Sequence, residues 1–270
     1  DHSGPGRGGP VNRTARVTVL GCGTSTGVPA IGCTEPVCLS GNPRNKRLRP
    51  SIVIESPAGN LLVDTGPDLR QQAIRHGLRR VDAVVYTHYH ADHTNGIDDM
   101  RVFNYLMKKA IPCYAYPETA RMLRRNFSYI FEDNNDYAGF KPELTLHERD
   151  EKSFGAGGIK VRPFALEHNG LRVMGLRVGD FAYATDCNAI PESSMEILKG
   201  ARWLILDALR HREHPSHFTV AQALEMVEAL KPAQTYFTHT TYDLAYCETN
   251  SMLPKGVELA YDGLSFEINL

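Results

Sequence analysis

The sequence predicts two β-sheets packed face to face, with helices covering their outer surfaces. Strand-like apolar runs dominate the 270 residues, and helical segments lie between groups of these runs. Several runs end at a histidine or an aspartate, a pattern that places polar side chains where buried strands stop. We therefore expect an α/β (α+β) sandwich with a polar site along one of its edges.

Composition supports a globular chain and argues against bulk binding of polyanions. Hydrophobic residues make up 42% and charged residues 23%, which is ordinary for a protein with a sizeable core. A net charge of −1 and a pI near 6.9 provide no overall field for nucleic acid or a membrane surface. No apolar run approaches the roughly 18 residues of a membrane span. Without a recognisable signal peptide, we expect a cytoplasmic protein whose cysteines stay reduced.

The N-terminal segments are predicted in the following order. Residues 1–12 are rich in glycine and proline, and we expect a disordered tail or an expression remnant there. The first strand spans residues 16–20 and leads into the glycine-rich loop 21–27. Residues 31–50 form a long polar loop that carries a basic run. The basic residues of that run are Arg44, Lys46, Arg47 and Arg49.

A hairpin and a helix are expected next. Residues 51–55 and 60–63 read as two strands around a turn rich in proline and glycine. A helix follows from about Pro67 and stops at Gly77. Its apolar face is expected to hold Leu69, Ala73 and Ile74.

The remaining chain alternates helices and strands. Residues 97–108 and 117–131 look helical, whereas residues 132–158 look irregular. The clearest helix spans residues 219–230, with Thr219 as its cap. Asp262-Gly263 between apolar runs predicts a final tight hairpin. Further strands are expected near 82–87, 159–166, 172–178, 181–185, 203–207 and 235–238.

The segment from His88 to His93 carries most of the chemical information. It reads His-Tyr-His-Ala-Asp-His directly after an apolar run, so three imidazoles and one carboxylate lie within six residues. Imidazole and carboxylate ligands together suit zinc, manganese or iron. His88 and His90 can share one ion, while Asp92 and His93 turn toward a second. The alternative is a solvated polar turn between strand and helix.

Four other polar residues follow apolar runs in the same way. Such positions let ligands from different strands meet along one edge of the sandwich. Taken singly, each histidine would more often be a satisfied interior residue, and each aspartate a turn or helix cap. Their shared placement favours a joint site. These residues are Asp64, His168, Asp186 and His239.

Together these motifs resemble the metallo-β-lactamase superfamily, whose central motif is His-x-His-x-Asp-His. The resemblance covers roughly residues 16–268, with all five motifs in family order. It implies an αββα sandwich of two mixed sheets flanked by helices, as a single domain over residues 13–270. It also implies two divalent metal ions, of zinc, manganese or iron.

The resemblance further implies a role for each site residue. One metal would be bound by His88, His90 and His168, the other by Asp92, His93 and His239, and Asp186 would bridge them. Asp64 would orient a ligand or the bridging hydroxide, and Asp92 would contribute to catalysis as well as to metal binding. The alternative for Asp64 is a helix cap before Pro67.

Two segments indicate which subfamily the chain resembles. Residues 21–29, with Gly32-Cys33, resemble the opening of the carbon–phosphorus lyase accessory phosphodiesterases (the PhnP-like subfamily). His217, in the segment 214–218, resembles a histidine of that subfamily that contacts the phosphate and can protonate the leaving oxygen. The resemblance thus implies hydrolysis of small phosphodiesters or nucleotides, cyclic ones included, by a hydroxide held between the metals. The alternative for His217 is a residue at a helix start with only a capping role.

One departure weakens the link to that subfamily. Its members can carry a structural zinc site made of three cysteines and a late histidine. Here Cys33 and Cys38 hold the outer cysteine positions, but Glu35 replaces the middle cysteine and Tyr242 the histidine. Two thiolates make a poor zinc site, so we expect this site to be absent or degenerate.

Three other functions remain as alternatives. A ribonuclease Z-like nuclease is disfavoured because the only long irregular insert, 132–158, is not strongly basic. Hydrolysis of a carboxylic ester, lactone or thioester would use the same metals. A non-catalytic scaffold would have lost metal ligands, and none is missing here. The sequence leaves open the exact substrate, the native metal, the true N-terminus and whether the chain forms a homodimer.

Overall fold

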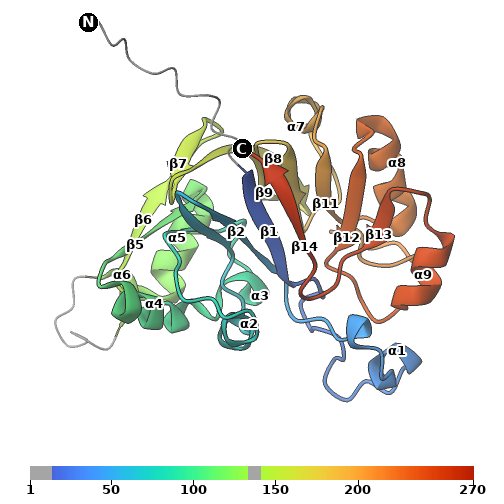
Figure 1. The fold of residues 1–270 in the computed structure, drawn as a ribbon, viewed down its shortest axis with the longest axis horizontal. Coiled ribbons are helices and arrows are strands. Elements are labelled where there is room, and N and C mark those ends of the chain that lie inside the picture. The colour runs from blue at the N-terminus through green and yellow to red at the C-terminus, as the bar shows by residue number, and fades with distance from the viewer. Residues whose placement is uncertain (1–13, 133–140) are drawn as a thin grey trace, which may run out of the picture.

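The computed structural model describes residues 14–132 and 141–270 as two mixed, seven-stranded sheets packed face to face. Helices cover the outer face of each sheet (Figure 1). The predicted αββα sandwich is confirmed. The tail expected at residues 1–12 lies outside the described residues. In the described ranges no helix is long and apolar enough to cross a membrane.

The first sheet carries the loop with the histidine motif. Strands β3 to β6 run parallel to one another, and Val63 on β3 pairs with Val85 on β4. Because the carboxyl ends of parallel strands meet at one edge, this register brings Asp64 close to the start of the histidine motif. In sheet order the strands are β14 (Ser265–Asn269), β1 (Thr14–Gly21), β2 (Ser51–Ser56), β3 (Gly59–Val63), β4 (Ala83–Val85), β5 (Ile111–Ala115) and β6 (Leu144–Glu148).

The second sheet supplies the remaining candidate site residues from the equivalent edge. Strands β10 to β13 are parallel, and Asp207 at the end of β11 pairs with Thr238 at the end of β12. The residues that follow these strands therefore share one edge with Asp207. In sheet order the strands are β13 (Val257–Leu259), β12 (Gln234–Thr238), β11 (Trp203–Asp207), β10 (Phe181–Ala184), β9 (Leu171–Val178), β8 (Ile159–His168) and β7 (Phe154–Ala156).

The main core lies between the two sheets, where residues such as Val17, Ile54 and Tyr183 are fully buried. Two further apolar clusters join each sheet to its helices. The first sheet is covered by α2 (Leu69–Arg75), α4 (Met100–Met107), α5 (Pro117–Asn126) and α6 (Ser128–Phe131), and the second by α7 (Glu192–Leu198), α8 (Val220–Leu230) and α9 (Tyr246–Met252). Shorter helical turns are α1 (Pro36–Leu39), α3 (Ala91–Thr94), η1 (Pro43–Asn45) and η2 (Ile97–Asp99).

Helix α8 illustrates how local sequence sets an element boundary. The Thr219 hydroxyl accepts a hydrogen bond from the Gln222 amide, and the Gln222 side chain accepts one from the Thr219 amide. This capping box satisfies two amides that a helix start would otherwise leave unpaired. The predicted helix and its cap are both confirmed.

Three expectations about elements were wrong. Residues 132–158 contain β6 and β7 rather than only irregular chain. Asp262-Gly263 does not close a hairpin, because β13 pairs with β12 in the second sheet and β14 pairs with β1 in the first. Ile74 does not share the buried face of Leu69 but is 65% exposed. In each case a tertiary contact, not the local pattern, decides the outcome.

Candidate metal centre

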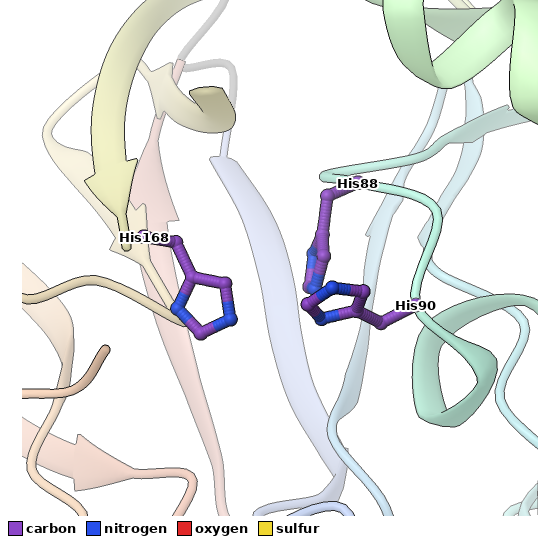
Figure 2. A group of neighbouring side chains, drawn as sticks. All are labelled: His88, His90 and His168. Carbon is purple, nitrogen blue, oxygen red and sulfur yellow. The ribbon is translucent and has the colours of Figure 1, made fainter. Parts of the chain in front are cut away.

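Three histidines from the two sheets face one another across the edge of the sandwich. His88 and His90 follow β4 of the first sheet, whereas His168 ends β8 of the second. Figure 2 shows the three imidazoles pointing toward a common point. One ring nitrogen from each histidine lies within 4.8 Å of the corresponding nitrogens of the other two. This spacing fits three ligands of one ion.

A second group lies beside the first and is more deeply buried. Its members are Asp92, His93, Asp186 and His239, and their ligand atoms also lie within 4.8 Å of one another. The Nε2 atoms of His93 and His239 each lie 3.2 Å from an Asp186 oxygen. Ligand atoms around a tetrahedral ion, at about 2.1 Å from it, would be separated by about 3.4 Å. The donor set and its spacing therefore fit a metal ion.

The hydrogen bonds of the histidines leave the inward nitrogens free for a ligand role. His88 Nε2 and His93 Nε2 are buried and make no hydrogen bond within the described part of the chain. On the opposite side of each ring, Nδ1 is held: by Thr87 Oγ1 at 3.1 Å for His88, and by Asp64 at 2.7 Å for His93. The carbonyl of Ser216 holds Nδ1 of His168 at 2.7 Å. Metal-binding histidines are typically oriented in this way.

The pKa shifts of the histidines differ between the two groups. Burial lowers the pKa of His88, His90 and His168, which keeps these imidazoles neutral. Burial alone would raise the pKa of Asp186, but the adjacent His239 and His93 hold it well below its usual value. Burial opposes protonation of His93, but the carboxylates around it, Asp186 first among them, outweigh burial and raise its pKa well above the usual value. Metal binding at His93 would therefore displace a proton, because the neutral imidazole is the form that binds a divalent cation.

Asp64 lies behind His93 rather than among the ligand atoms. Its fully buried carboxylate accepts hydrogen bonds from the Thr87 amide, from the Thr87 hydroxyl and from His93 Nδ1, at 2.8, 2.8 and 2.7 Å. Burial raises the pKa of Asp64, although His93 and Thr87 oppose the shift. The helix-cap alternative is wrong, because Asp68 occupies the cap position of α2. Asp64 thus fixes the ring that would bind the metal.

The backbone is strained at three of these positions. Asp64, Asp186 and His239 have φ values of 63°, 53° and 58°, in the left-handed region that side chains other than glycine rarely adopt. Each residue lies just beyond the end of a strand. Strain of this kind costs about 1–3 kcal/mol and is typical of functional sites.

A histidine–aspartate pair lies against both ligand groups. His217 is buried, and its Nδ1 lies 2.6 Å from Asp207 Oδ2. Its ring stacks on His239 with 4.5 Å between centroids and meets the edge of His168 at 4.7 Å. Burial opposes protonation of His217, but Asp207 outweighs it and raises the pKa of His217 to about 9.

Sequence reasoning missed Asp207, although the signal was present. Asp207 ends β11 as an aspartate after an apolar run, the rule that identified the other site residues. Its carboxylate also accepts a hydrogen bond of 2.9 Å from the amide of Cys187, which fixes its position.

The arginines near His217 make contacts within the protein. The guanidinium of Arg210 donates to the carbonyls of Arg212 and Glu213, and Arg212 forms an ion pair with Asp243 at 3.1 Å. These contacts hold the loop that carries His217.

The glycine-rich loop lies beside His239. The Thr24 amide donates to the carbonyl of Thr240, the residue after His239, at 3.1 Å. A Cβ at Gly23 would lie 2.7 Å from the Arg47 carbonyl, so only glycine fits there. These contacts place the loop at the edge of the candidate site.

The expectation that all cysteines stay reduced was wrong for two of them. Cys33 and Cys38 form a disulfide whose Cα atoms are 6.1 Å apart. Tyr242 packs against the same small apolar cluster. The turn between Cys33 and Cys38 brings their two sulfur atoms together.

Comparisons with known proteins agree with this geometry. The model of the β-lactamase superfamily domain matches residues 59–240. A curated relative from Porphyromonas gingivalis (strain ATCC BAA-308 / W83), named octanoyltransferase, is 36% identical over 253 residues, which is 92% of this chain. The chain spans about half of that relative's length, 51%.

Solved structures extend the comparison. A crystal structure described as a new diphosphatase from the PhnP family is 42% identical, with a TM-score of 0.89 and coverage of 95% of this chain and 98% of that one. The short form of human tRNase Z (ELAC1) is 18% identical, with a TM-score of 0.66 and coverage of 94% and 100%. At that identity, the second likeness concerns the fold alone.

Proposed function

Because the chain belongs to the β-lactamase superfamily, we propose that it is a phosphodiesterase that works with two divalent metal ions. The observation that carries this proposal is the position of Asp186 between the two ligand groups. One of its oxygens lies 3.7 Å from His88 Nε2, and its carboxylate lies 3.2 Å from both His93 and His239. A carboxylate so placed can serve both ions.

In this proposal His88, His90 and His168 would hold the first ion, Asp92, His93 and His239 would hold the second, and Asp186 would contribute to both. Zinc, manganese and iron all suit this donor set. Two such ions would supply a nucleophile from water near neutral pH and would neutralise charge on the phosphoryl oxygens.

The chain's own residues perform the remaining tasks. His217 lies against His168 and His239, where it can donate a proton to the leaving oxygen. Asp207 holds the His217 ring through Nδ1, which leaves Nε2 to face the substrate. Asp64 keeps the His93 ring in the tautomer that presents Nε2 to the second ion.

A small phosphodiester or diphosphate compound is the substrate class that we propose. The diphosphatase of the PhnP family is similar over nearly the whole chain, which supports a phosphoryl substrate. The net charge of −1 disfavours tight binding of a long polyanion.

A second candidate is hydrolysis of a carboxylic thioester. The observation that favours it is the name octanoyltransferase of the curated relative. Because this chain spans about half of that relative, the match leaves open which half carries the named activity.

A substrate panel separates these candidates. Protein stripped with a chelator and reloaded with manganese or zinc would be given a 2′,3′-cyclic nucleotide, a dinucleotide with a diphosphate linkage, an octanoyl thioester and a tRNA precursor. We expect metal-dependent hydrolysis of one or both small phosphoryl compounds, with Asp186→Ala as the inactive control. Turnover of the thioester or the RNA alone would refute the proposal.

A further inference from the structure

The basic run in the loop 31–50 contains one arginine whose role is not explained by contacts within the protein. Lys46 donates to a backbone carbonyl of the same loop. Arg47 is buried and donates to the segment 240–244. Arg44 donates to a tyrosine hydroxyl of α9. These three cations hold the loop in place, whereas Arg49 has charge that the loop itself does not use.

The position of Arg49 is fixed by contacts with the start of α2. Its backbone amide donates to Asp68 Oδ2 at 2.8 Å, and its carbonyl accepts from Gln72 Nε2 at 2.9 Å. Its side-chain Nε forms an ion pair of 3.3 Å with the same Asp68 oxygen. The backbone of Arg49 and one side of its guanidinium are therefore held in a single place.

This place lies at the rim of the candidate metal centre. A Cβ on Gly66 would lie 2.2 Å from the carbonyl oxygen of Asp92 and 3.6 Å from the Cβ of Arg49, so Gly66 lies against both residues. At the other end of the side chain, a Cβ on Gly27 would lie 3.5 Å from Arg49 Nη1. Gly27 belongs to the glycine-rich loop, which contacts the segment after His239. The guanidinium thus lies between this loop and the candidate ligands.

The outer side of the guanidinium remains available to a ligand. The Arg49 side chain is 29% exposed, and Nη1 and Nη2 donate no hydrogen bond to any described residue. An arginine that served only to pair with Asp68 would often present two parallel N–H groups to that carboxylate. Here Nε alone approaches Asp68. The two terminal nitrogens form a planar fork of the kind that binds phosphoryl oxygens in pairs.

We propose that Arg49 binds a second phosphoryl group of the substrate, next to the phosphoryl group that the two metals would bind. This inference rests on the proposed function and narrows its substrate class to diphosphate compounds. A substrate with one phosphoryl group would place its charged oxygens on the metals and leave the fork unused. A diphosphate compound carries a second anionic group directly beside the first. Arg49 would then determine specificity without taking part in bond cleavage.

The test measures binding of two uncleaved ligands to metal-loaded protein by calorimetry. One ligand is a dinucleoside methylenediphosphonate, whose two phosphorus atoms are joined by carbon, and the other is a nucleoside 5′-monophosphate. Loss of hydrogen bonds to a charged group predicts that Arg49→Gln weakens binding of the diphosphonate by about 10–100-fold. Binding of the monophosphate should not change. Arg49→Lys keeps the charge but loses the fork, so its loss should be smaller than that of Arg49→Gln.

Arg80→Gln is the matched control. Arg80 also forms an ion pair with an aspartate, Asp82 at 2.6 Å, but it lies before β4, at the end of the strand opposite the site. The control should bind both ligands as the wild type does, and all variants should retain two metals. Equal weakening of both ligands in Arg49→Gln, or unchanged affinity for the diphosphonate, would overturn the inference.

Kinetics provide a second readout that a purely structural role would not produce. Arg49→Gln should raise KM for a dinucleotide with a diphosphate linkage and leave KM for a 2′,3′-cyclic nucleotide unchanged. A parallel rise in both KM values would contradict the inference. The ligands used in calorimetry are not cleaved, so failure of this inference appears in the affinities. Failure of the proposed function would appear instead as absence of phosphoryl turnover in the wild type.

Discussion

Asp64→Asn is the substitution that most selectively tests how Asp64 orients the His93 ring. The change conserves size, and asparagine tolerates the left-handed backbone of this position, where φ is 63°. The amide oxygen can still accept from the Thr87 amide. The amide nitrogen, however, would replace the Oδ2 atom that now accepts from Thr87 Oγ1 and from His93 Nδ1 at 2.8 and 2.7 Å.

That replacement acts on metal binding through the tautomer of His93. A donor opposite Nδ1 favours the ring form with its proton on Nε2, the atom that would bind the metal. The lost hydrogen bond to a charged group is worth about 1.5–3 kcal/mol, and supporting groups of this kind typically change metal affinity by about 10–100-fold. We therefore expect weaker binding at the second ion, with the first ion affected much less.

The assay is competition with a chelator, followed by counting of metal ions per chain. Asp68→Asn is the matched control, since Asp68 lies four residues away, accepts from the Arg49 amide at 2.8 Å and touches no ligand histidine. The control should retain both metals. Unchanged affinity in Asp64→Asn, or equal loss at both sites, would refute the reasoning.

Three other perturbations have defined outcomes. Asp186→Ala should remove the shared ligand and lower both metal content and turnover to background, so near-normal turnover would remove Asp186 from the site. His217→Ala should lower kcat by about 10²–10⁴-fold with two metals retained, and Asp207→Asn should give a smaller loss; loss of metal in His217→Ala would instead make it a ligand. Burial raises the pKa of Asp262 from 3.8 to about 6, despite hydrogen bonds from the amides of Leu48 and Cys22. The folded chain then binds this proton more tightly than the unfolded chain, so the wild type should lose about 3 kcal/mol relative to Asp262→Asn as the pH rises from about 3 to about 7. Denaturant unfolding of both proteins at several pH values measures that difference, and a constant difference would contradict the assignment.

The proposed ligands could be anticipated because one local rule places most of them. Each follows or ends a buried apolar run, and the carboxyl ends of parallel strands meet at one edge. Val63 pairs with Val85 in the first sheet, and Asp207 pairs with Thr238 in the second. These registers align the ends of neighbouring strands, so the residues that follow them lie close together. Apolar runs bounded by polar residues are visible without any knowledge of tertiary structure.

What could not be predicted depends on contacts between distant segments. Strand β6 forms at a sheet edge, and only Leu144 and Leu146 of its five residues pack against the core, so its apolar alternation is too short to identify a strand. The turn at Asp262-Gly263 is visible, but the pairing of Ser265 with Thr18 in the other sheet is not. Likewise, nothing local distinguishes the outward position of Ile74 from the inward position of Leu69.

The most direct test of the central claim is a titration of metal-free protein with manganese or zinc, with turnover of a 2′,3′-cyclic nucleotide measured at each step. The two groups of ligand atoms, joined by Asp186, predict that activity appears only as the second ion per chain is bound. Full activity with one ion per chain, or no turnover of any phosphodiester with two ions bound, would contradict the account.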